Sequence, residues 1–170
     1  MDERFTVGVV VRNDFGVLNR VAGLFAKRCY NIDSLAVGVT ENPKFSRITI
    51  VSTGDEYKKE QVVRQLQKLH DVKLVALLDG DSSVSVEHVL AKMCVDGETS
   101  AEISDLINEY GGKVMDFSSD FITAEITGTT EKIDKFILAA KNRGILEICR
   151  SGGIAMAHGT ENMLSIKDLV

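Results

Sequence analysis

The sequence predicts an α+β fold in which one unit, strand–helix–strand–strand–helix–strand, occurs twice. Apolar residues recur every three or four positions in four segments, as on one face of a helix, and alternate or run continuously in eight shorter segments, as in strands. These segments follow the same order in both halves of the chain, and a short polar linker at residues 80–84 separates the halves. A unit with this order folds as an antiparallel sheet with two helices on one face, the ferredoxin-like arrangement.

The first half, residues 1–79, is predicted to contain all six elements of the unit. Strands are expected at residues 5–11, 32–40, 45–53 and 72–78, and helices at residues 16–30 and 56–70. The first helix has an apolar stripe at helical spacing, formed by Leu18, Val21, Ala22, Phe25 and Cys29. Asn42 and Pro43 mark a turn between the two middle strands. Glu60 and Arg64 form an i,i+4 ion pair on the polar face of the second helix.

The second half, residues 85–152, repeats the plan. Strands are expected at residues 86–95, 113–117, 121–127 and 145–149, and helices at residues 100–110 and 130–140. Gly111 and Gly112 end the first of these helices, because glycine adopts the left-handed conformation that stops a helix. Residues 118–120, Ser-Ser-Asp, are expected to form a hairpin turn. The tail, residues 153–170, could extend a sheet, dock on a partner or be disordered, and disorder is the plainest expectation for a terminus.

Composition excludes several classes of protein. The formal net charge is −5 at pH 7 and no lysine- or arginine-rich run occurs, which opposes a nucleic-acid partner. Cys29, Cys94 and Cys149 are far apart and have apolar neighbours, so free, buried thiols are expected rather than disulfides or a metal site. The acidic N-terminus does not resemble a signal peptide, and no apolar run is long enough to span a bilayer. The expected location is the cytoplasm.

Motifs that would indicate catalysis are missing from the sequence. It contains no nucleophile elbow, phosphate-binding loop, dinucleotide-binding glycine motif, H-E-x-x-H or C-x-x-C. His70, His88 and His158 are spread along the chain and nothing brings them together. We therefore expect no catalytic residue, no metal ligand and no cofactor in this chain. A small enzyme in the manner of acylphosphatases would need an arginine in a glycine-rich phosphate loop, and the sequence around Arg12 does not resemble one.

The turn after the first strand is the candidate binding site. Asn13-Asp14-Phe15-Gly16 leads directly into a helix, and the first turn of a helix has backbone N–H groups without partners and a partial positive charge. A small carboxylate or phosphate suits this position, and Gly16 allows it to approach the backbone. The alternative is a purely structural turn in which Asn13 or Asp14 caps the helix.

Motifs over nearly the whole length resemble one family. This segment is similar to the opening of an ACT domain, and the chain resembles the small, regulatory subunits of acetohydroxyacid synthase, also called acetolactate synthase. The matching pieces are Asn13-x-x-Gly16-x-Leu18, Gly23-Leu24-Phe25, residues 30–35, 46–50 and 65–72, and Arg150-Ser151-Gly152. Arg12 and Phe15 depart from the family pattern, so the effector's identity stays open.

The resemblance implies a function and a set of effector-binding residues. Regulatory subunits of this family bind a branched-chain amino acid, usually valine, and both inhibit and activate a separate catalytic subunit that carries thiamine diphosphate, magnesium and FAD. By resemblance, the carboxylate would bind the backbone N–H groups of Gly16, Val17 and Leu18 while Asn13 holds the turn. Asn31, which could also be a helix C-cap, would reach the ligand, and Ile32 would line an apolar pocket with Val17 or Leu18.

A homodimer is expected through the strand that starts at Ile32. In this topology that strand lies at the edge of the sheet, and its sequence up to Val39 has neither the lysine nor the proline that usually protects an edge. Pairing with the same strand of a second subunit would bring Asn31 to the partner's Gly16 turn. The alternative function is a free-standing tandem-ACT amino-acid sensor that regulates a different enzyme or a transcription system.

Overall fold

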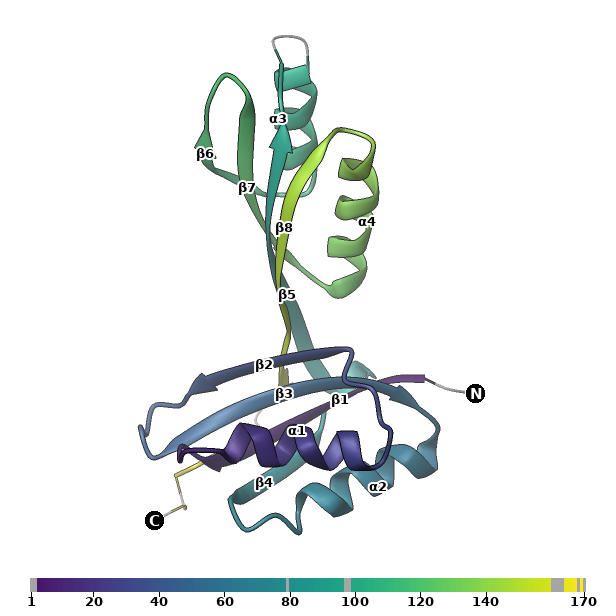
Figure 1. The fold of residues 1–170 in the computed structure, drawn as a ribbon, viewed down its shortest axis with the longest axis vertical. Helices are drawn as coiled ribbons and strands as arrows, with labels where there is room; N and C mark the ends of the chain where they lie inside the picture. Colours follow the sequence, from purple (N-terminus) through teal and green to yellow (C-terminus); the bar gives the residue numbers. More distant parts are fainter. Residues whose placement is uncertain (1–2, 79, 97–98, 160–163, 168, 170) are drawn as a thin grey trace. The chain divides into compact units, whose positions relative to one another are not determined.

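The computed structural model describes residues 3–78, 80–96, 99–159, 164–167 and 169. The chain forms two compact units (Figure 1). The first consists of Met1–Ser85 together with Gly153–Val170, and the second of Val86–Gly152. Each contains a four-stranded sheet with two helices, so the predicted doubled βαββαβ fold is confirmed. No helix in the described part of the chain has the length and hydropathy needed to cross a membrane.

The first unit contains a sheet with strand order β2-β3-β1-β4. Its elements are β1 (Glu3–Arg12), α1 (Val17–Lys27), β2 (Ser34–Val39), β3 (Phe45–Gly54), α2 (Glu56–Leu66) and β4 (Val72–Leu77). Alternate residues of the central strand β1, including Val7 and Val9, pack with the buried faces of α1 and α2. Val10, on the other side of β1, belongs to a second apolar cluster. Both faces of this sheet are therefore covered, which explains the continuous apolar run in β1.

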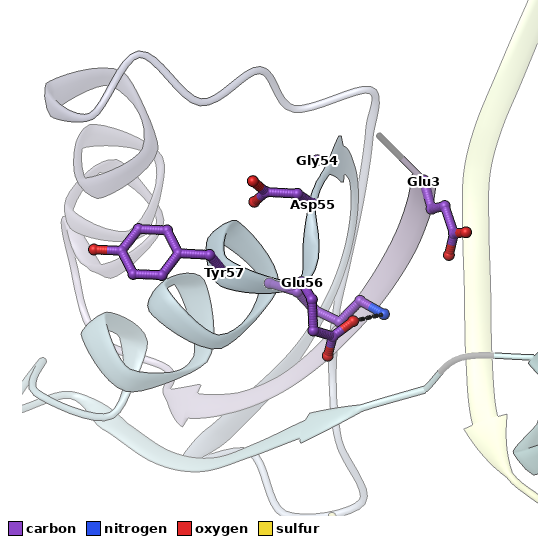
Figure 2. A pocket seen from close by; sticks show the side chains of 6 residues that line it. Glu3, Gly54, Asp55, Glu56 and Tyr57 are labelled. Atoms are coloured by element: carbon purple, nitrogen blue, oxygen red, sulfur yellow. Dashed lines mark ion pairs between the residues drawn. The ribbon is translucent and has the colours of Figure 1, made fainter. Parts of the chain in front are cut away.

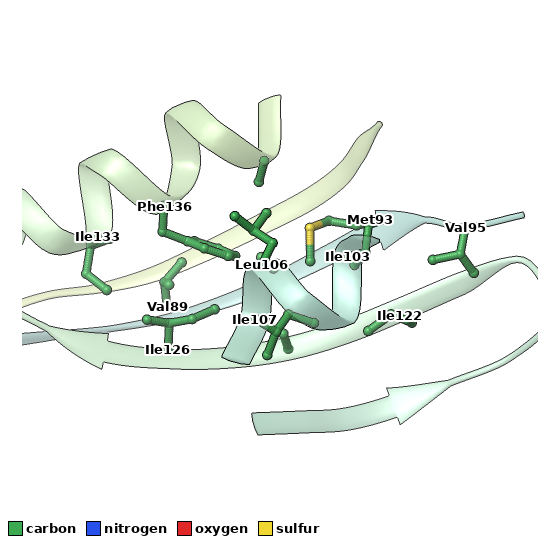
Figure 3. Close-up of a cluster of buried hydrophobic side chains, with 13 residues drawn as sticks. Val89, Met93, Val95, Ile103, Leu106, Ile107, Ile122, Ile126, Ile133 and Phe136 are labelled. Atoms are coloured by element: carbon green, nitrogen blue, oxygen red, sulfur yellow. The ribbon is translucent and has the colours of Figure 1, made fainter. Parts of the chain in front are cut away.

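The second unit has the equivalent strand order, β6-β7-β5-β8. Its elements are β5 (Ser83–Cys94), α3 (Thr99–Glu109), β6 (Lys113–Phe117), β7 (Phe121–Gly128), α4 (Thr130–Lys141) and β8 (Ile145–Ala157). Figure 3 shows its core, in which Met93, Ile103 and Phe136 are fully buried between the sheet and the two helices. Tyr110 packs edge-on against Phe136, with the ring centroids 5.5 Å apart.

The same strand-to-helix corner occurs once in each unit, and the sequence analysis missed it. Thr53-Gly54 and Thr127-Gly128 end equivalent strands, and a lysine in the first turn of the next helix folds back over each glycine. Lys58 Nζ donates to the carbonyl of Thr53, and Lys132 Nζ donates to the carbonyl of Thr127. Both lysines sit four positions after the glycine, so the repeat extends to individual side-chain contacts.

Turns and local pairs agree with their predictions. Phe45 N–H donates to Asn42 O at 2.9 Å in the turn that contains Pro43. Gly111 ends α3 with a φ of 61°, and the Ser118–Phe121 hydrogen bond of 2.8 Å closes the hairpin. Arg64 Nη2 lies 3.2 Å from Glu60 Oε2. The expected burial of the cysteines is wrong, because all three thiols are free but exposed.

The C-terminal region differs most from the expectation. β8 continues to Ala157, whereas a strand of residues 145–149 was expected. Gly80–Ser82 form a short 3-10 helix and β5 begins at Ser83, so residues 80–84 are not a separate linker. The expected tail, residues 153–170, belongs to the first unit, and its Leu164 and Ile166 are buried. Disorder is therefore the wrong description of these two residues.

Candidate functional site

The turn between β1 and α1 has the backbone geometry that an anion site needs. Gly16 is the N-cap residue of α1 and has a φ of 78°, a left-handed conformation that favours glycine. No side chain of the described residues caps this helix. Asn13 Nδ2 instead donates to Pro43 O at 3.0 Å and ties the turn to the β2–β3 loop. The alternative in which the side chain of Asn13 or Asp14 caps α1 is therefore wrong.

The start of α1 also lacks acidic residues. Its first turn contains none, whereas the first turns of α2, α3 and α4 contain Glu56, Glu102 and Glu131. Carboxylates at these positions complement the positive end of a helix. In α1 no acidic residue of the first turn complements that positive end.

An arginine that the sequence analysis missed lies beside Gly16. Arg20 Nε donates to Asp71 Oδ2 at 2.7 Å, and Asp71 precedes β4. A Cβ placed on Gly16 would lie 3.2 Å from Arg20 Nη1, which places the guanidinium at the turn. Asp71 is itself held, because its carbonyl accepts the Arg12 N–H at 2.9 Å. Arg20 lies four positions after Gly16, and this helical spacing was a usable clue.

The six predicted effector residues fall into two groups. Asn13, Gly16, Val17 and Leu18 lie together at the start of α1. Val17 is 3% exposed and packs in the core, so only its backbone can face a ligand. Leu18, expected in the buried stripe, is instead 42% exposed. This is because the buried face of α1 runs through Val17, Val21, Leu24 and Phe25.

Asn31 and Ile32 lie beyond the other end of α1. The helix has 11 residues, which corresponds to a length of about 16 Å. Asn31 is exposed and donates from Nδ2 to Asp33 Oδ1 at 2.6 Å, while Ile32 is half-buried against the core. A single chain therefore does not bring Asn31 to its own Gly16 turn. A site made of both groups requires a second copy.

Strand β2 provides a surface on which a second copy could pair. It lies at the edge of the first sheet, as predicted, and pairs only with β3 among the described strands. Val37 and Val39 are 50% and 60% exposed, so apolar side chains accompany the open backbone groups. An edge with these features is suited to pairing with another strand.

A pocket at the start of α2 is a poor alternative for the carboxylate of an amino acid (Figure 2). It is lined by Glu3, Gly54, Asp55, Glu56, Tyr57 and Lys59. Asp55 already caps α2 by accepting Lys58 N–H at 2.8 Å, and Glu56 pairs with Lys59 at 3.1 Å. Three carboxylates against one lysine would repel an anionic group.

The corresponding turn of the second unit is occupied by its own side chains. Thr99 N–H donates to Asp96 Oδ1 at 2.8 Å, and Asp96 N–H donates to Thr99 Oγ1 at 2.9 Å. Gly97 and Glu98, in the same turn, lie outside the described residues. This reciprocal cap satisfies N–H groups that are free of side-chain caps in α1.

Comparisons with known proteins identify both halves of the chain. Residues 7–73 match the AHAS small subunit-like ACT domain, and residues 86–159 match the family described as small subunit of acetolactate synthase. The acetolactate synthase small subunit of Haemophilus influenzae is 40% identical over 95% of this chain and 99% of its own length. That of Bacillus subtilis is 41% identical over 94% of this chain and 93% of its own length.

A solved structure agrees with both the sequence and the fold. The crystal structure of the acetolactate synthase small subunit from Thermotoga maritima superimposes with a TM-score of 0.87 and 35% sequence identity. The match covers 94% of this chain and 99% of that one. With its two family matches and its relatives over almost the full length, this chain belongs to the acetolactate synthase small-subunit family.

Proposed function

We propose that this chain is the non-catalytic, regulatory subunit of an acetolactate synthase in branched-chain amino acid biosynthesis. It binds valine or another branched-chain amino acid, mediates feedback inhibition and activates a separate catalytic subunit. The observation that carries the proposal is the start of α1. There a glycine with a φ of 78°, an acid-free first turn and the Arg20 guanidinium meet in a member of the small-subunit family.

The effector carboxylate accepts hydrogen bonds from the backbone N–H groups of Gly16, Val17 and Leu18. Asn13 holds the turn through Pro43 O, and Arg20, which pairs with Asp71 through Nε, presents its Nη1 beside it. Because the Val17 side chain is buried, the exposed Leu18 side chain is the apolar surface on this turn. Asn31 and Ile32 of a second copy complete the site.

Regulation follows from placing the effector between two copies. An amino acid in this position favours the arrangement of subunits that binds it better, and a coupling of about 1–3 kcal/mol changes activity several-fold. Thiamine diphosphate, magnesium and FAD belong to the catalytic subunit in this proposal. Valine, leucine and isoleucine differ by a methylene group or its position, and a methylene is worth about 1–3 kcal/mol, so all three are candidate effectors.

The proposal is tested by ligand-dependent unfolding. In a panel of the twenty amino acids, a branched-chain amino acid at 100 times its Kd should stabilise the purified chain by about 2.7 kcal/mol, and amino acids without an apolar side chain should not. The same ligand should inhibit acetolactate formation by the reconstituted complex with a catalytic subunit. A chain that responds to no amino acid contradicts the proposal. Co-purification from native extract without a thiamine-dependent enzyme would favour the free-standing sensor.

Val37→Lys should dissociate the proposed dimer. The two lysines introduced on the paired edge strands repel each other, and we expect the dimer dissociation constant to rise at least about tenfold. Analytical ultracentrifugation measures the change. Val114→Lys is the matched control, because Val114 is 46% exposed on β6, the equivalent edge strand of the second unit. An intact Val37→Lys dimer, or loss of the dimer in Val114→Lys, would argue against pairing through β2.

A further inference from the structure

The C-terminal segment crosses the face of the first sheet that lies opposite its helices. We call the described residues of this segment, 153–159, 164–167 and 169, the C-terminal strap. Gly153 N–H donates to Ser34 Oγ of β2 at 3.0 Å, and Ala155 O accepts from Arg47 Nη2 of β3 at 2.6 Å. Leu164 lies over Gly8 of β1. The strap therefore contacts β2, β3 and β1, which are neighbours in that order in the sheet.

Apolar packing holds the strap on the sheet. Ala155, Leu164 and Ile166 are 7–8% exposed and form one cluster with sheet residues. The sheet residues of this cluster are Val10, Phe45, Ala76 and Leu78. Gly8 provides the space for Leu164, because a Cβ at Gly8 would overlap with Leu164 Cδ1 and lie 2.8 Å from Leu78 Cδ1. A glycine inside a strand often marks this kind of close approach.

The strap touches the two segments that carry the effector residues. Gly8 and Val10 are on the strap side of β1, and β1 leads directly into the Asn13–Gly16 turn. Ser34, which accepts from Gly153, is only three residues after Asn31. No strap contact involves the six effector residues themselves among the contacts of the described chain.

We propose that the C-terminal strap is a positioning element of the effector site. When docked, it holds β1 and the start of β2 in the alignment that the Gly16 turn and Asn31 need. When it is released, the site residues remain but bind the effector more weakly. Leu164 and Ser34 are then positioning residues that act through β1 and β2. This inference rests on the proposed amino-acid binding, and it adds a control of that binding from outside the site.

The strap is held on the first sheet by a smaller set of apolar contacts than the helices of this unit. Residues 153–157 are the end of β8, which lies beside β5, and His158 N–H donates to Ser82 O at 2.9 Å. On the first sheet itself, the bonds of Gly153 and Ala155 and three buried side chains hold the strap, whereas the helices α1 and α2 share the larger core of the unit. Segments with few buried contacts open locally without global unfolding. An effector that binds the aligned site better would also favour the docked strap.

Leu164→Ser tests the proposal. Hydrogen exchange of residues 153–159 should accelerate, and the Kd for valine measured by calorimetry should rise at least about fivefold. Leu164→Met keeps the side-chain volume, so its exchange rate and its Kd for valine should stay close to those of the native chain. Leu138→Ser is the matched control, because Leu138 is 69% exposed on α4 and should change neither. Gly8→Ala displaces Leu164 from the sheet side, so adding Leu164→Ser to it should produce little further change.

The outcomes separate this inference from the proposed function. Accelerated exchange with an unchanged Kd would show that the strap only covers the sheet, and it would overturn the inference alone. Exchange that stays slow in Leu164→Ser would also overturn it, because Leu164 would then not hold the strap. A native chain that binds no branched-chain amino acid would overturn both proposals.

Discussion

The Gly16→Asp variant should lose effector binding by at least about 100-fold, or roughly 2.7 kcal/mol. Gly16 is the N-cap of α1, and the proposed effector carboxylate lies against the N–H groups of this turn. Two like charges about 4 Å apart near a protein surface repel by about 4 kcal/mol, so an aspartate there opposes the ligand directly. Calorimetric titration with valine measures the loss, and feedback inhibition of the reconstituted complex should disappear with it.

Gly16→Asn is the matched control for charge. Asparagine has nearly the shape of aspartate and tolerates a φ of 78°, so both variants place a side chain of the same size beside Arg20 Nη1 and differ in its charge. Binding should be weakened much less by asparagine than by aspartate. The dimer should persist in both, because the turn is not part of the β2 edge. If Gly16→Asp bound valine with native affinity, the effector carboxylate would not lie at this turn. If both variants lost the same affinity, the loss would come from the shape of the new side chain and not from its charge.

Arg150→Ala should destabilise the second unit by about 3 kcal/mol, the lower end of the range for breaking a buried ion pair by removing one partner, because Arg150 itself is 36% exposed. Arg150 binds Glu87 through two hydrogen bonds, of 2.5 and 2.8 Å, and Asp134 through a third of 2.9 Å. Glu87 is 3% exposed, so the substitution leaves a buried carboxylate without its partner. The Glu87 carboxylate also raises the pKa of the Arg150 guanidinium above its usual value.

Arg64→Ala is the control for this prediction. Its pair with Glu60 is also an arginine–glutamate contact, but the two side chains are 65% and 54% exposed. Exposed helical pairs contribute about 0.3–0.5 kcal/mol, so this variant should unfold nearly as the native protein does. Urea unfolding followed by circular dichroism, with hydrogen exchange to locate the loss in residues 86–152, measures both. Similar stabilities for the two variants would mean that Glu87 finds another partner or is hydrated.

The order of strands and helices could be predicted because it depends on local periodicity. The buried face of α1 could not, because Leu18 and Val17 both fit an apolar stripe and only packing shows that Val17 is buried and Leu18 exposed. The strap was missed for a different reason. Its position at a terminus favoured disorder, whereas its docking depends on Gly8, about 150 positions away in the sequence.

The candidate site was predictable only where its residues are close in sequence. The spacing of Asn13, Gly16 and Leu18 indicated the turn, and the edge position of β2 followed from the topology. The Arg20–Asp71 pair joins residues 51 positions apart, and such a contact leaves no periodic pattern. The structure also shows why Asn31 needs a second copy, because α1 separates it from the turn of its own chain.

The division of the chain has a consequence for its synthesis. The second unit is an insertion, formed by the continuous residues 86–152, and it can fold as soon as it leaves the ribosome. The first unit needs Leu164 and Ile166 to cover its sheet, so it is completed only after the insertion has been made. Until then Val10 and Phe45 face water, and a nascent chain stalled before residue 164 would present them as a chaperone-binding or aggregation-prone surface.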